Sequence, residues 1–206
     1  MKTIVKGNMV IAQSGGPSMV INQSLIGAVL AARASSKIGK IYGALHGISG
    51  ILNENFIDLR KQSVAQLECV AQTPSSALGS IRKKPTAEDC AKIFAVLKKR
   101  NVRYFFYIGG NDSAETVHIV NEEAKKENFD LCCFHIPKTI DNDLRGNDHT
   151  PGFGSAARFV AMAFMGTTLI TVRLEALKLI SSWDAMPVFS RRRVRWREYT
   201  PKMVRI

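Results

Sequence analysis

The chain has 206 residues, of which 46% are apolar, so it can bury a core and is not a disordered protein. Its net charge is +12, and half of this excess lies in residues 171–206. The rest of the chain is only mildly basic, as is typical of a protein that handles phosphates, which argues against nucleic acid as its main partner.

The sequence shows neither a membrane segment nor a cysteine metal motif. No run of 18 apolar residues exists, and residues 1–7 lack the apolar stretch of a secretory signal. The four cysteines, Cys69, Cys90, Cys132 and Cys133, have no metal-ligand spacing, and we expect the adjacent pair to be packed thiols. We therefore expect a cytoplasmic protein.

The first predicted unit is a buried strand over residues 9–13, a glycine turn over residues 14–18 and a helix over residues 19–33. In this order, glycine lets the backbone approach an anion, and the free N–H groups at the helix start point at it. Gly15 and Gly16 are therefore either a phosphate-binding turn or a plain tight turn.

The next stretch contains a short strand over residues 40–45, a loop around Gly47, a helix over residues 63–72 and a loop over residues 73–85. The second loop is rich in hydroxyl groups and ends in three cations. It is either a solvated basic loop or a segment whose Arg82 faces a polyphosphate.

The strongest strand pattern covers residues 102–108, after a helix that Thr86 is expected to cap. The strand leads into a glycine turn over residues 109–113, and a helix follows over residues 114–126. Asp112 in this turn is either a helix cap or an electrostatic element that faces a phosphate or its metal.

The third unit carries most of the reactive groups. An apolar strand over residues 131–136 ends at Pro137, which cannot donate to a strand ladder, and an apolar helix follows later over residues 153–169. The loop between them contains a cation, a hydroxyl and two carboxylates, namely Lys138, Thr139, Asp141 and Asp143.

This repeated strand–helix order predicts an α/β fold with a doubly wound, mostly parallel sheet. In such a sheet the carboxyl ends of the strands share one edge. We therefore expect the two glycine turns, Arg82 and the loop over residues 138–143 to gather at that edge.

Together these segments resemble the phosphofructokinase family. The resemblance covers roughly residues 5–170 and rests on residues 15–22, 78–80 with Arg82, 109–113 and 137–143. It implies the Rossmann-like N-terminal domain of that family, in truncated form. Lys138 and Asp112 resemble the pyrophosphate-dependent branch, because ATP-dependent members usually have glycine at both positions. An ATP-dependent enzyme is the alternative.

The resemblance implies phosphoryl transfer from pyrophosphate to the 1-hydroxyl of fructose 6-phosphate, which gives fructose 1,6-bisphosphate in a reversible step of glycolysis. Asp141 would act as general base, and Thr139 and Ile140 would contact the sugar. Lys138 would neutralise charge on the transferring group, and Asp112 would repel the α-phosphate of ATP. Gly15 would offer its N–H to the donor phosphate, and the implied donor phosphate-binding residues are Gly15, Gly16, Arg82, Gly110 and Ser113.

The resemblance also implies Mg²⁺ as the cofactor. Asp143 would hold magnesium-bound water or orient the loop, and the residue at position 111 would be a second ligand. The family usually has aspartate there, whereas this chain has Asn111, whose amide oxygen can ligate Mg²⁺ but brings no charge. Either the metal is held chiefly through phosphates and water, or activity is reduced.

The family pattern fails after about residue 170, which divides the chain into a phosphate-donor-binding and catalytic domain, 1–170, and a basic tail, 171–206. Back-translated with permitted codons and read one nucleotide earlier, residues 182–193 become Met-Gly-Arg-Asn-Ala-Gly-Phe-Leu-Thr-Ala-Ala, the family motif expected in this region. We therefore predict that the tail is out of frame and that the chain is an inactive fragment of a homo-oligomeric enzyme.

A function of another class also fits the composition. The chain would then be a non-catalytic protein whose basic tail binds nucleic acid. A salt-dependent affinity for DNA that disappears when residues 171–206 are deleted would favour this alternative.

Overall fold

The computed structural model describes residues 5–83 and 85–174. Two compact units divide the chain after Ala156, and the described residues of the second unit belong to a single helix. Most of the predicted basic tail, residues 175–206, lies outside the described residues, so its assignment stays a prediction.

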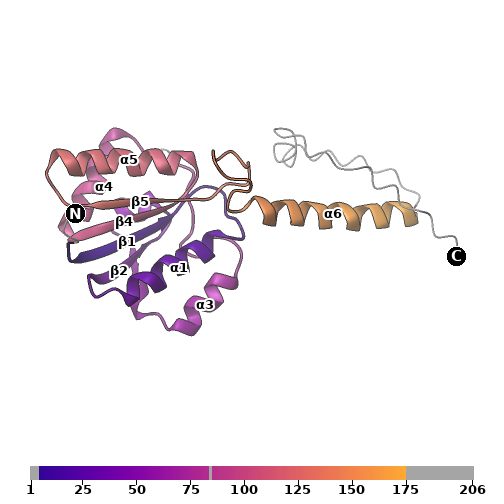
Figure 1. Cartoon of the computed structure of the whole chain (residues 1–206), viewed down its shortest axis with the longest axis horizontal. Coiled ribbons are helices and arrows are strands. Elements are labelled where there is room, and N and C mark those ends of the chain that lie inside the picture. Colours follow the sequence, from indigo (N-terminus) through magenta and orange to yellow (C-terminus); the bar gives the residue numbers. More distant parts are fainter. Residues whose placement is uncertain (1–4, 84, 175–206) are drawn as a thin grey trace. The chain divides into compact units, whose positions relative to one another are not determined.

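The first unit is built around a five-stranded sheet with the order β3-β2-β1-β4-β5 (Figure 1). The strand pairs are parallel except for the antiparallel pair β2–β3. This arrangement confirms the predicted α/β fold with a mostly parallel sheet. The strands are β1 (Gly7–Gln13), β2 (Ile38–Ala44), β3 (Phe56–Asp58), β4 (Val102–Gly109) and β5 (Cys132–Pro137).

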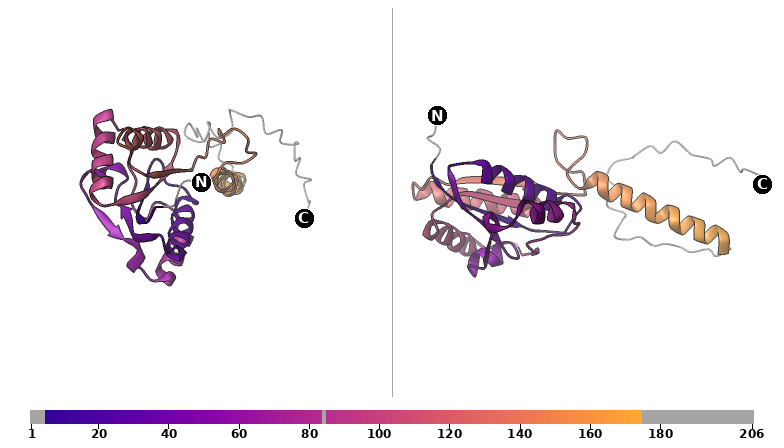
Figure 2. Two further views of the ribbon diagram at one scale, coloured as in Figure 1. Left: turned by 60° about the vertical axis from the view of Figure 1, so that its left-hand side comes forward. Right: turned by 90° about the horizontal axis from the view of Figure 1, so that it is seen from below.

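Helices cover both faces of this sheet (Figures 1 and 2). One face packs against α1 and α3 in a core that includes Met9, Ile11 and Leu25. The other packs against α2, α4 and α5 in a core that includes Phe105 and Ile93. The helices are α1 (Ile21–Ala34), α2 (Ile48–Leu52), α3 (Val64–Gln72), α4 (Ala87–Lys99), α5 (Asn111–Lys126) and α6 (Phe153–Leu174), with a 3₁₀ turn η1 (Leu59–Lys61).

Side-chain caps explain where two of these helices begin. Ser63 and Gln66 form a reciprocal capping box at the start of α3, and Thr86 and Asp89 form one at the start of α4. Each box satisfies backbone N–H groups that have no partner within the helix. The cap expected at Thr86 is therefore confirmed.

The structure differs from the sequence-based elements in several places, one of which is the end of α6, at Leu174 instead of residue 169. The region around Gly47, expected to be a loop, contains the five-residue helix α2, and the short strand β3 follows it without having been predicted. Helix α5 begins at Asn111, three residues earlier than expected, because Gly110 already serves as its N-cap residue. Both short elements carry too few residues to show a hydrophobic period.

The cysteines are free thiols, but the adjacent pair is not uniformly packed. Cys132 is exposed, so the expectation of a packed thiol is wrong for it, whereas Cys133 is half-buried. Burial, and then the neighbouring Cys132, raise the pKa of the Cys133 thiol to about 12. Cys133 therefore stays protonated and unreactive near neutral pH.

The strand order creates a crevice at one edge of the sheet. The connections that leave β1 and β4 run through α1 and α5, which pack on opposite faces, although the two strands are neighbours. At such a switch point the chain turns away to both sides and leaves space beyond the carboxyl ends of the strands. No helix in the described part of the chain is long and apolar enough to cross a membrane.

Candidate active site

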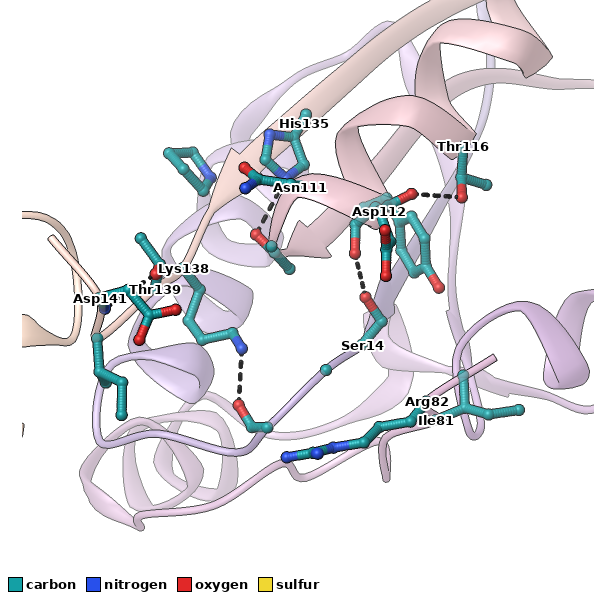
Figure 3. A pocket seen from close by; sticks show the side chains of 18 of the residues that line it. Ser14, Ile81, Arg82, Asn111, Asp112, Thr116, His135, Lys138, Thr139 and Asp141 are labelled. Carbon is teal, nitrogen blue, oxygen red and sulfur yellow. Dashed lines mark hydrogen bonds between the residues drawn. The ribbon is translucent and has the colours of Figure 1, made fainter. Parts of the chain in front are cut away.

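An open cavity of about 820 Å³ lies beyond the carboxyl ends of β1, β4 and β5 (Figure 3). The sheet edge therefore brings together the residues that the sequence placed on three separate units. All of the predicted site residues line it, namely Gly15, Gly16, Arg82, Gly110, Asn111, Asp112, Ser113, Lys138, Thr139, Ile140, Asp141 and Asp143.

The Lys138 ammonium is buried against the first glycine turn. Lys138 is only 8% exposed, and its Nζ donates to the Gly16 carbonyl at 2.7 Å. Burial, and then the Arg82 guanidinium, hold the pKa of Lys138 below its ordinary value, and the Asp141 carboxylate opposes this effect. Two cations that repel each other in this way favour an anion bound between them.

The turn passes close to two cations of the cavity. Gly15 has φ of +77°, and a Cβ there would lie 3.1 Å from the Lys138 Nζ. A Cβ on Gly16 would lie 3.5 Å from the Arg82 Nη2. A larger residue at Gly15 would therefore be strained and would displace the ammonium.

One expected role does not match the geometry. The Gly15 N–H was expected to face the donor phosphate, but it donates to the Ile81 carbonyl at 3.2 Å. The Ser80 hydroxyl also donates to the Gly15 carbonyl. The backbone of Gly15 therefore holds the loop that carries Arg82 rather than presenting a free donor.

A buried glutamine connects this loop to the sheet. Gln13 is fully buried; its amide donates to the Asn22 Oδ1 at 3.1 Å, and its oxygen accepts from the Leu78 N–H at 2.9 Å. The Ser76 hydroxyl donates to the same oxygen at 2.8 Å. These bonds fix the path of the chain towards Arg82, and without Gln13 the buried Leu78 N–H would lose its partner.

The loop after β5 is held by its own polar groups. The Thr139 Oγ1 accepts from the Asp141 N–H at 3.1 Å, and the Thr139 carbonyl accepts from the Thr150 hydroxyl at 2.8 Å. The Asn142 side-chain oxygen accepts from the Thr150 N–H at 2.9 Å. The exposed Asp141 carboxylate is thus carried by an ordered loop beside Lys138.

The first turn of α5 forms another wall of the cavity. The Asn111 amide donates to the Asp143 Oδ2 at 3.4 Å, which joins this helix to the loop after β5. Asp112 is exposed, and in Figure 3 it lies on the opposite side of the view from Asp141. The buried Ser113 hydroxyl pairs with the Ser14 hydroxyl. The cavity therefore has one carboxylate, Asp141, close to Lys138 and another, Asp112, in the first turn of α5.

Several polar residues that line the same cavity were not among the predicted site residues, including His135, Tyr107 and Thr116. Burial raises the pKa of the Tyr107 hydroxyl, and the Thr116 hydroxyl donates to the Asp112 carbonyl at 2.8 Å. His135 is half-buried, and its Nε2 lies 3.0 Å from the Gly109 carbonyl. The one signal for it was a polar side chain inside an apolar strand.

Comparisons with known proteins agree with this geometry. The family model described as Phosphofructokinase matches residues 8–168. The chain is 60% identical over 164 residues to the pyrophosphate–fructose 6-phosphate 1-phosphotransferase of Rhodospirillum rubrum, a match that covers 80% of this chain and 41% of that protein. It is 31% identical over 150 residues to the ATP-dependent 6-phosphofructokinase of Glaesserella parasuis, which covers 71% and 43% of the two chains.

A solved structure is also similar to this chain. The pyrophosphate-dependent phosphofructokinase from Nitrosospira multiformis superposes with a TM-score of 0.77 at 39% sequence identity, over 84% of this chain and 44% of that one. The chain thus spans less than half the length of each of these three proteins.

Proposed function

The chain belongs to the phosphofructokinase family over residues 8–168, and we propose that it carries the donor-binding and catalytic groups of a pyrophosphate-dependent 6-phosphofructokinase. Such an enzyme transfers a phosphoryl group from pyrophosphate to the 1-hydroxyl of fructose 6-phosphate. The observation that carries the proposal is a single cavity in which the Lys138 ammonium meets a glycine turn and the Asp141 carboxylate lies on the same loop.

Pyrophosphate is preferred as donor over ATP for two reasons. The chain is more similar to the pyrophosphate-dependent relative than to the ATP-dependent one. In addition, Lys138 places a cation at the glycine turn, and Asp112 places a carboxylate in the first turn of α5, where it repels a longer polyphosphate. A repulsive group that acts only on the wrong donor raises specificity without weakening the right one.

In the proposed reaction Asp141 takes the proton of the sugar 1-hydroxyl as that oxygen bonds to the nearer phosphorus of pyrophosphate. The bond from this phosphorus to the bridging oxygen breaks, and inorganic phosphate leaves. Lys138 and Arg82 neutralise charge on the donor, while Thr139 and Ile140 contact the sugar. Positioning and charge neutralisation do most of the work, because the transition state of phosphoryl transfer is loose.

The residues present fit a magnesium ion that is held mainly by the substrate. Among the described residues no group of three or more acidic, histidine or cysteine side chains is arranged to bind a metal. Asp143 and the Asn111 amide oxygen would supply one or two oxygen ligands, which suits Mg²⁺ because it usually keeps several waters and binds substrate phosphates. When bound, the ion neutralises charge on the pyrophosphate.

Binding of the two donors tests the proposal. Isothermal titration of the purified chain with pyrophosphate and with ATP, each with magnesium chloride, should show binding of pyrophosphate and at least tenfold weaker binding of ATP. The double variant Asp112→Gly, Lys138→Gly should lose this preference. Absence of pyrophosphate binding would refute the proposal, and equal binding of both donors by the unaltered chain would favour an ATP-dependent enzyme.

A further inference from the structure

His135 lies in the candidate site but has no part in the proposed reaction. It is on β5, whose neighbour β4 ends at Gly109, and its Nε2 is 3.0 Å from the Gly109 carbonyl oxygen (Figure 3). A carbonyl oxygen can only accept, so the Nε2 carries the proton and donates. Burial lowers the pKa of His135, which keeps the ring neutral near pH 7.

The carbonyl that His135 contacts lies at the junction between β4 and α5. Gly109 ends β4, and Gly110 is the N-cap residue of α5. The Gly109 carbonyl also accepts from the Lys138 N–H at 2.9 Å, so it receives one donor from β5 and one from the residue that follows β5. The orientation of the Gly109–Gly110 peptide is therefore set from the β5 side.

Two consecutive glycines do not restrict the orientation of the peptide between them, because neither has a side chain. Without side chains, the Gly109–Gly110 turn has wide backbone freedom, yet the first turn of α5 is anchored on it, since the N–H groups of Ser113 and Ala114 donate to the Gly110 carbonyl. Asn111 and Asp112 follow directly in that turn and line the cavity. A rotation of this peptide would move the donor-facing wall of the site.

We propose that His135 is a positioning residue, which holds the Gly109–Gly110 turn through its Nε2–H bond to the Gly109 carbonyl and so aligns the first turn of α5 with bound pyrophosphate. This inference rests on the proposed function. The histidine does not touch the reacting atoms; it acts through the backbone of the turn.

Two amide substitutions of His135 test this proposal. In His135→Gln the side-chain amide reaches about as far as the Nε2 and retains a donor for the Gly109 carbonyl. In His135→Asn the amide is equally polar but one methylene shorter, so it does not reach that oxygen. His135→Phe keeps a ring and removes the donor.

We expect His135→Asn and His135→Phe to bind pyrophosphate about three- to tenfold more weakly in isothermal titration with magnesium chloride, the effect of one lost neutral hydrogen bond. His135→Gln should bind within about twofold of the unaltered chain. The melting temperature of the unliganded His135→Asn chain should stay close to that of His135→Gln. The matched control is His118→Asn, on the exposed part of α5, which should bind normally.

The inference is overturned if His135→Asn binds pyrophosphate as tightly as the unaltered chain, or if His135→Gln is as weak as His135→Asn. If His135→Phe does not fold, the Gln and Asn pair still decides the question. If the unaltered chain itself binds no pyrophosphate, the proposed function fails, and this inference falls with it; the two failures are thus distinguishable.

Discussion

The charge of the buried Lys138 side chain depends on pH. Its pKa is lowered by burial and by Arg82, so its charge is lost at a lower pH than that of an ordinary lysine. The ammonium donates to the Gly16 carbonyl from inside the cavity, which is the position of a group that pairs with a bound anion. The affinity for pyrophosphate should therefore follow its protonation.

We expect pyrophosphate affinity to fall as pH rises through the pKa of Lys138, which lies below the ordinary lysine value of 10.5, because Lys138 is charged below its pKa and neutral above it. The variant Lys138→Arg should remain charged and show no such fall, since arginine keeps its proton above pH 12. Isothermal titration at a series of pH values measures this. A parallel decline in both proteins would show that Lys138 is not the titrating group.

Gly109 and Gly110 are adjacent, but they differ in the space available for a side chain. A Cβ on Gly109 would overlap the hydroxyl oxygens of Ser113 and Ser14, whereas a Cβ on Gly110 has the Lys138 carbonyl oxygen as its nearest neighbour at 4.0 Å. We expect Gly109→Ala to lower the free energy of unfolding by about 2–3 kcal/mol and Gly110→Ala by less than about 1 kcal/mol. Urea unfolding of the two variants measures the difference. An equal loss of unfolding free energy in the two variants would contradict the close packing around Gly109.

At the scale of elements, Gln13 connects the end of β1 to the start of α1 and to the loop that carries Arg82. It bonds to Asn22 and to Leu78 while fully buried. Neither helix nor strand propensity accounts for the position of that loop. The hydrogen bonds of the Gln13 side chain and of the Gly15 backbone do, and they place a cation at the edge of the sheet.

Replacement of Gln13 by leucine should lower the free energy of unfolding by about 2–4 kcal/mol, because it leaves the buried Leu78 N–H without its partner and removes one of the two donors to the Asn22 Oδ1. The control is Gln72→Leu at the exposed end of α3, which should change stability by less than about 0.5 kcal/mol. Urea unfolding again measures both. A cost for Gln13→Leu no larger than that of the control would show that the network does not stabilise the loop.

At the scale of the whole molecule, the described core lies within the first unit. The buried apolar residues run from Met9 to Ala124, and the first unit ends at Ala156. The two cores on either side of the sheet are therefore complete without any described residue of the second unit. The cavity is lined entirely by residues of the first unit as well.

Deletion of residues 157–206 should consequently leave the melting temperature of the sheet domain within about 4 °C of that of the full chain. A shift of that size corresponds to roughly 1 kcal/mol in a domain of this length. Differential scanning calorimetry of the two proteins checks this. A larger fall, or loss of a cooperative transition, would mean that residues after Ala156 help to hold the sheet.

Several features of the fold and the site were predictable from local patterns. The strand–turn–helix units, the cap at Thr86 and the gathering of Lys138, Asp141 and the glycine turns at one sheet edge follow from hydrophobic period and turn chemistry. These signals act over a few residues, and the sequence displays them directly. The family could be predicted for the same reason.

Tertiary structure alone decided which partners those groups have. The Gly15 N–H bonds to Ile81, the Ser14 hydroxyl meets Ser113, and His135 holds Gly109. Each of these contacts joins residues far apart in the sequence, and it exists only because the strand order brings separate turns to one edge. The sequence by itself determined which chemical groups the chain has and where its turns lie; the packing of the sheet determined which of them are free to meet a ligand.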